Sequence, residues 1–99
     1  MKIIHKMLED LAEEVDGAKE YAEKYIESRV LNNTNRAEKY KEMAYDELKH
    51  AGYVRAMALE DAESLKRVYT LSEETASHWE HELKHLNEEM AIVKQMLSM

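Results

Sequence analysis

The stretch Ala44–Ala51, with the sequence AYDELKHA, sets a carboxylate and an imidazole three residues apart in a strongly helical region. Residues three apart share one face of a helix, so the side chains of Glu47 and His50 are expected to point the same way. Steps of three and four from Glu47 reach Tyr40, Ala44, Ala51, Val54 and Ala58. An ionisable group therefore lies inside an apolar stripe.

A second stripe nearer the N-terminus repeats this register and contains Glu14: Met7, Leu11, Glu14, Ala18, Tyr21 and Tyr25. Two antiparallel helices joined by a short turn bring residues level when these are equidistant from the turn. The midpoint of positions 14 and 47 lies between Val30 and Leu31, where the turn signals begin. Glu14, Glu47 and His50 are thus expected at one height, and buried carboxylates there need the charge compensation that metal ions supply.

Composition limits the class of protein. The chain has 99 residues, no Pro, two Gly and many Glu, Lys, Ala, Leu and Met, which predicts an all-α fold in one domain, 1–99. A net charge of −7 argues against nucleic acid or an anionic membrane as a partner. The absence of Cys fits a reducing compartment, and no apolar run approaches a membrane span, so a cytoplasmic location is expected. A chain this short buries a smaller share of its surface than a large domain does, which makes association with a partner chain plausible.

Helices are expected at about 3–30, 35–69 and 72–98. Gly17 lies inside the first, which indicates that another group packs closely there. Asn35 with Glu38 predicts an N-cap for the second helix, and Thr70 or Ser72 one for the third. The third helix has the most regular apolar seam: Trp79, Leu83, Leu86, Met90, Val93 and Leu97.

Glu14, followed by Tyr21 seven residues later, together with the Glu47-x-x-His50 helix resembles the ferritin-like di-iron carboxylate proteins, especially rubrerythrin and its relatives. The resemblance covers roughly residues 10 to 55. In that family a Glu on one helix and Glu-x-x-His on the next form half of a four-helix dimetal site. The resemblance implies that Glu14, Glu47 and His50 are metal ligands, with Tyr21 behind them, and that the activity is oxidation of ferrous iron.

The chain lacks a complete second half of that pattern. Glu82 and His85 form another Glu-x-x-His, but a turn near residues 70 to 72 leaves them roughly 15 Å or more from the level of Glu47. Two copies related by a two-fold axis would instead complete a four-helix bundle holding two iron ions, a ferroxidase site across a homodimer interface. Such an architecture is similar to the encapsulated ferritins, which implies a dimer or higher multiple and a larger shell as a partner. The third helix would then serve assembly.

Simpler interpretations remain open for each of these residues. Glu14 and Glu47 would lie at the rim of the seam, paired with Lys or Tyr, if the helices rotated slightly. Tyr21 is also consistent with an aromatic residue of the core. The helix face with His78, His81 and His85 is consistent with solvated surface histidines, and also with a surface site for zinc, copper or nickel. The alternative functions are a metal-free helical assembly or adaptor protein, and a structural zinc or manganese site.

Overall fold

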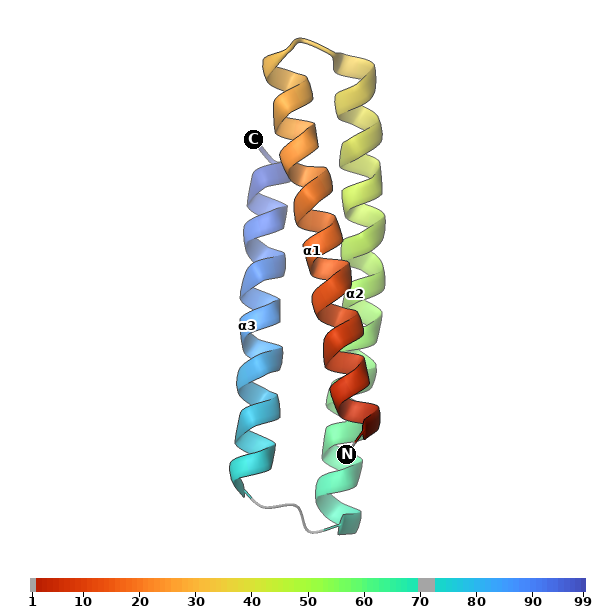
Figure 1. Ribbon diagram of the computed structural model, residues 1–99, viewed down its shortest axis with the longest axis vertical. Helices are drawn as coiled ribbons and strands as arrows, with labels where there is room; N and C mark the ends of the chain where they lie inside the picture. The colour runs from red at the N-terminus through yellow and green to blue at the C-terminus, as the bar shows by residue number, and fades with distance from the viewer. Residues whose placement is uncertain (1, 70–72) are drawn as a thin grey trace.

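The computed structural model describes residues 2–69 and 73–99, and the side chains of residues 6–61, 63 and 77–99. Within these ranges it contains no strand and three helices: α1 at Lys2–Val30, α2 at Thr34–Tyr69 and α3 at Glu73–Leu97. α1 and α2 form an antiparallel hairpin, and α3 runs back alongside it in the direction of α1 (Figure 1). The predicted all-α hairpin with a third helix is confirmed, and each helix end differs from its prediction by at most one residue.

The α1–α2 connection is short because the end of one helix overlaps the start of the next. Asn32 adopts a left-handed backbone conformation with φ of 58°. Its N–H donates to the carbonyl of Arg29, and that of Asn33 to the carbonyl of Ser28, the two bonds of a Schellman cap. Asn is one of the few residues other than Gly that tolerates positive φ, so the sequence favours a helix end at this position.

Asn33 also begins α2. Its side-chain Oδ1 accepts a hydrogen bond from the backbone N–H of Arg36 at 3.2 Å, so Asn33 is the N-cap. The N-cap predicted at Asn35 is therefore wrong by two residues, since Asn35 already lies inside the helix. The caps predicted for the third helix, Thr70 or Ser72, lie outside the described residues.

The core combines a seam of small residues with a seam of large ones. The apolar stripes predicted on α1 and α2 are buried or partly buried, and five fully buried alanines contribute to them: Ala18, Ala22, Ala44, Ala51 and Ala58. Small side chains let two helices approach closely. α3 packs mainly against α1. Its predicted seam is buried throughout: Trp79, Leu83, Leu86, Met90, Val93 and Leu97.

The molecule is a rod, with principal extents of 55 × 16 × 16 Å (Figure 1). In the described part of the chain, none of the three helices is both long enough and apolar enough to cross a membrane.

Candidate functional site

Glu14 of α1 and His50 of α2 meet across the hairpin. The Nδ1 atom of His50 lies 2.6 Å from Oε1 of Glu14, a hydrogen bond in which the imidazole N–H donates to the carboxylate. The Glu14 side chain is 18% exposed and that of His50 is 67% exposed, so the carboxylate is covered while the ring faces outward. The two residues meet because they are nearly equidistant from the turn, as their positions in the sequence indicate.

The second carboxylate oxygen of Glu14 has no comparable partner. Oε2 is buried, and no hydrogen bond to it is found among the described residues. A buried carboxylate oxygen without a donor or a cation is energetically unfavourable. Glu14 therefore has the capacity to accept one further interaction.

Glu47 lies on the same seam, one helical turn before His50. Its side chain is half-buried, and it lies over Gly17 of α1: its Oε2 is 3.7 Å from the position that a Cβ at Gly17 would occupy. The Glu47 carboxylate is the nearest group to that position, but a methyl group would fit there, so the close packing expected at Gly17 is not found. Within the described part of one chain, no three His, Asp or Glu side chains are grouped as metal ligands. The hairpin brings Glu14 and His50 into contact and places Glu47 beside Gly17.

Tyr21 is part of an aromatic pair. Its ring stacks on that of Tyr40 from α2, with centroids 6.4 Å apart and an angle of 24° between the ring planes. Both residues pack against the core as partly buried side chains. This is the core aromatic role considered for Tyr21, and for the residues that the structure describes no hydrogen bond from Tyr21 to Glu14, Glu47 or His50 is recorded.

The acidic and histidine residues of α3 lie apart from this pair. His78 and His81 are exposed, and His85 Nε2 lies 3.9 Å from Oε1 of Glu89 one turn later on the same helix. Glu82 is half-buried. Over the described ranges these side chains form no group of three potential ligands with one another or with Glu14 and His50.

An exposed apolar stripe on α2 was not predicted from the sequence. Met43, Tyr53 and Met57 are 41%, 60% and 48% exposed. Met43 lies seven residues before His50, Tyr53 three residues after it and Met57 seven residues after it. The four side chains therefore share one face of the helix. We call these three residues the α2 stripe. The helical spacing of these three residues is visible in the sequence. However, they lie beside the buried residues Ala44, Ala51 and Ala58, and the exposed stripe was not distinguished from that buried one.

No family model matches the chain, and comparisons with curated proteins and with solved structures likewise give no match. Over residues 2–69 and 73–99, the structure defines a protein of three helices in which a carboxylate and imidazole pair joins α1 to α2.

Proposed function

We propose that this chain is a metal-binding subunit similar to the ferritin-like proteins. In this proposal two copies pair about a two-fold axis, and Glu14, Glu47 and His50 of each copy together bind two iron ions. The reaction is the oxidation of ferrous iron, which is the substrate.

The observation that supports the proposal most is the contact of Glu14 with His50. It joins residues 36 positions apart at one level of the hairpin, with His50 Nδ1 2.6 Å from Glu14 Oε1. The buried Oε2 of Glu14 without a hydrogen-bond partner among the described residues fits a group that accepts a cation. Carboxylates with an imidazole suit iron, manganese or zinc, so the donor set is compatible with the proposed metal.

The α2 stripe supports a second copy as the other half of the site. Met43, Tyr53 and Met57 extend the face that carries His50, and a partner on this face would cover them and the exposed side of the imidazole. Four-helix sites of this class take one Glu from each of two helices and Glu-x-x-His from each of the other two. Two hairpins supply that set, because each contributes Glu14 and the Glu47/His50 pair.

The chain's own contribution would be to bind and orient the metal. Glu14 and Glu47 supply anionic oxygen ligands, which favour the higher oxidation state, and His50 supplies the nitrogen. Bound iron would supply the electron-transfer chemistry with dioxygen or peroxide as the oxidant.

A metal-free helical assembly protein is the second candidate. The observation that favours it is the same contact, since a hydrogen bond of Glu14 to His50 compensates the carboxylate without any metal. The α2 stripe would then be an interface and nothing more.

Anaerobic titration with ferrous iron separates the two candidates. Untagged protein would be stripped of metal, titrated without oxygen and analysed for bound iron, with its mass measured by light scattering. We expect about one iron per chain in an even-numbered oligomer. Glu47→Ala and His50→Ala should each lose most of this uptake.

Asp46→Asn is the matched control, because Asp46 is an exposed acid next to Glu47 on the same helix. It should retain the iron uptake of the wild type. Wild-type protein that binds no ferrous iron would overturn the metal-site proposal and leave the assembly protein. Zinc or manganese uptake with the same loss in the variants, but no iron oxidation in air, would identify a structural site.

A further inference from the structure

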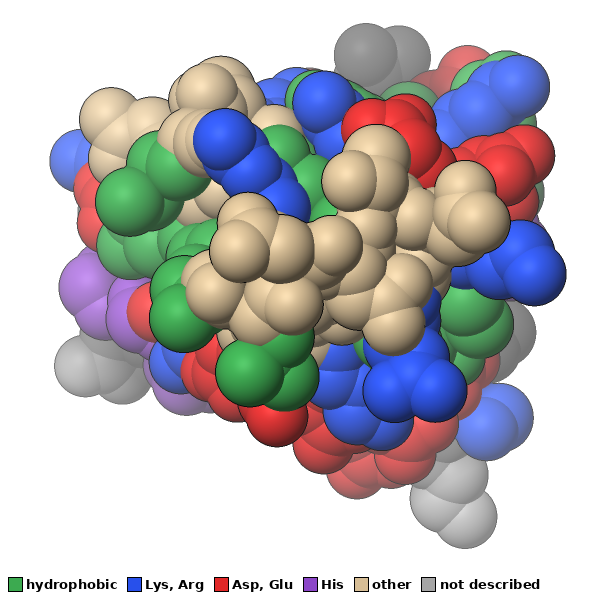
Figure 2. All heavy atoms as spheres, turned by 90° about the horizontal axis from the view of Figure 1, so that it is seen from above, with side chains coloured by type: hydrophobic (Ala, Val, Ile, Leu, Met, Phe, Trp, Pro, Cys, Tyr) green, Lys and Arg blue, Asp and Glu red, His purple; other side chains and the backbone are tan. Residues whose placement is uncertain are grey.

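The connection between α1 and α2, with the turns of helix that flank it, contains more basic than acidic residues. Residues 24–41 contain five basic and two acidic residues, which leaves nine basic and nineteen acidic residues elsewhere. Figure 2 looks down on this end of the rod and shows Lys and Arg side chains around the connection. A local positive charge on a protein of net charge −7 attracts anions to this end.

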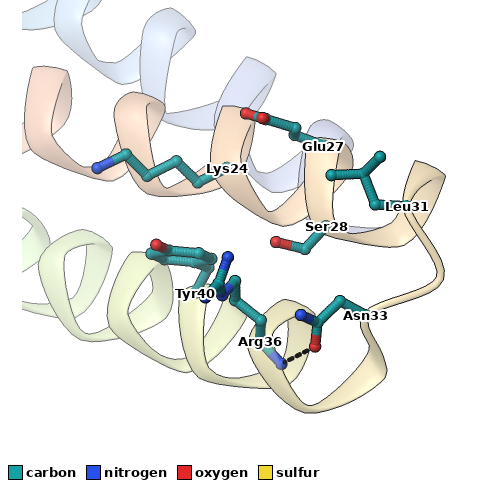
Figure 3. A pocket seen from close by; sticks show the side chains of 7 residues that line it. All are labelled: Lys24, Glu27, Ser28, Leu31, Asn33, Arg36 and Tyr40. Atoms are coloured by element: carbon teal, nitrogen blue, oxygen red, sulfur yellow. Dashed lines mark hydrogen bonds between the residues drawn. The ribbon is translucent and has the colours of Figure 1, made fainter.

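A pocket of about 250 Å³ opens between the two helices at this end. It is lined by Lys24, Glu27, Ser28, Leu31, Asn33, Arg36 and Tyr40 (Figure 3). The size is below that of typical pockets for drug-sized ligands, so the pocket suits a small molecule or a single functional group.

Ser28 is a buried polar residue within this lining. It is only 4% exposed, and no hydrogen bond of its hydroxyl is recorded in the described part of the chain. In Figure 3 the hydroxyl points from α1 into the space between the helices, toward Tyr40 and Arg36. Ser28 lines the pocket, so its hydroxyl can donate a hydrogen bond to a ligand there.

The other polar groups around Ser28 are mainly donors. Asn33 uses its Oδ1 to cap α2, which leaves its side-chain NH₂ free to donate. Arg36 and Lys24 have no ion pair recorded among the described residues. Lys24 Nζ lies 5.7 Å from the centre of the Tyr40 ring, and in Figure 3 its side chain extends past the hydroxyl end of that ring, on the side away from Ser28 and Asn33.

Glu27 is the one carboxylate in the lining, and Figure 3 shows it directed away from α2. The lining therefore carries two positive charges and one negative charge, together with the hydroxyl and amide donors. It also lies at the N-terminus of α2, where the helix dipole favours negative charge.

We propose that this pocket binds a phosphate group. Arg36 would balance its charge beside Ser28 and Asn33, which would donate hydrogen bonds to its oxygens, while Lys24 would add positive charge at the edge of the pocket. The source is either inorganic phosphate or the phosphate of a small monoester. The site is independent of the proposed metal centre, because it shares no residue with Glu14, Glu47 or His50.

Titration of the ¹⁵N-labelled protein with inorganic phosphate tests this proposal, with glycerol phosphate in a second arm and chloride used to hold the ionic strength constant. We expect saturable shifts of the backbone amide signals of Ser28, Asn33 and Arg36. Arg36→Gln should weaken binding about tenfold or more, as loss of a hydrogen bond between charged groups predicts. Ser28→Ala should weaken it about threefold to tenfold without unfolding the helix, since Ala fits the space and favours helix.

Lys39→Gln is the control, because Lys39 is an exposed base on the same helix that does not line the pocket. The affinity of the Lys39→Gln protein for phosphate should change by less than about threefold, as expected for a distant surface charge. Saturation by both ligands would show that the pocket accepts a monoester, and saturation by inorganic phosphate alone would show that it takes the free ion. Shifts that do not saturate, or equal weakening by Lys39→Gln and Arg36→Gln, would overturn the proposal.

Discussion

At Gly17 of α1, the Glu47 carboxylate lies near the position that a side chain would occupy. An added Cβ would lie 3.7 Å from Oε2 and 3.8 Å from Cδ of Glu47, so a methyl group fits without displacing either. We therefore expect Gly17→Ala to stabilise the fold by about 0.5–1 kcal/mol through helix propensity. Urea unfolding followed by circular dichroism measures this change.

Gly52→Ala is the reference for Gly17→Ala, because nothing in the described part of the chain lies within 4 Å of a Cβ at Gly52. Both variants should gain similar stability. A Gly17→Ala protein less stable than the wild type would show that Glu47 cannot tolerate the methyl group.

The Glu14 to His50 contact should appear as a coupling energy between two substitutions. In metal-free buffer, a double-mutant cycle with Glu14→Gln and His50→Gln should give about 0.5–1.5 kcal/mol, in the range of a net hydrogen bond. The exposed imidazole keeps the value toward the lower end, because water screens it. Glu14→Gln paired with Lys49→Gln, an exposed neighbour of His50, should give a coupling near zero.

The contact between Glu14 and His50 was predictable from the sequence, whereas the directions of the side chains were not. Counting residues from the turn placed Glu14, Glu47 and His50 at one level, and the structure does bring Glu14 and His50 together. Spacing alone does not fix side-chain torsions, so the direction of the Glu47 side chain toward Gly17 could not be predicted from the sequence. The close packing that the sequence indicated at Gly17 is not found, since a methyl group would fit there.

At the level of the helices, two substitutions in the turn between α1 and α2 test which residue caps α2. Asn33→Ala removes the side-chain bond to the Arg36 N–H and should cost about 1 kcal/mol, as for other N-cap substitutions. Asn35→Ala changes a residue already inside α2 and should be neutral or slightly stabilising. Thermal unfolding of the two variants distinguishes them, and a larger loss at Asn35 would contradict the assigned cap.

The error in the predicted cap has a specific physical origin. The segment from Leu31 to Asn35 contains three Asn and one Thr, all of them good capping residues. What selects Asn33 is the positive φ of Asn32 and the pair of Schellman bonds that end α1. The apolar seams were easier to predict, because each is repeated over several turns and one ambiguous residue does not shift it.

At the level of the whole molecule, we expect a second copy of the chain to associate through the α2 stripe. Met57→Glu places a charge on this face and should shift the proposed dimer to monomer, since an unpaired charge buried in an interface is costly. Sedimentation across a concentration series measures the equilibrium. Tyr45→Glu is the control, because Tyr45 is 44% exposed on α2 but lies two residues from Met43 and so on another side of the helix.

Tyr45→Glu should leave the dimer intact. Equal dissociation by Tyr45→Glu and Met57→Glu would show that association does not depend on the α2 stripe. The sequence shows the helical spacing of this face, but it does not show which apolar residues a third helix covers. α3 packs mainly on α1, and that choice leaves the α2 stripe exposed.

The elongated shape of the molecule affects how its association state can be measured. The radius of gyration is 16.1 Å, compared with about 13 Å for a compact chain of 100 residues. A rod experiences more friction in solution than a sphere of equal mass, so even a monomer will leave a gel-filtration column early, at the volume of a heavier globular protein. Elution volume therefore overstates the mass, whereas a method that measures mass independently of shape, such as light scattering or equilibrium sedimentation, gives the true number of chains.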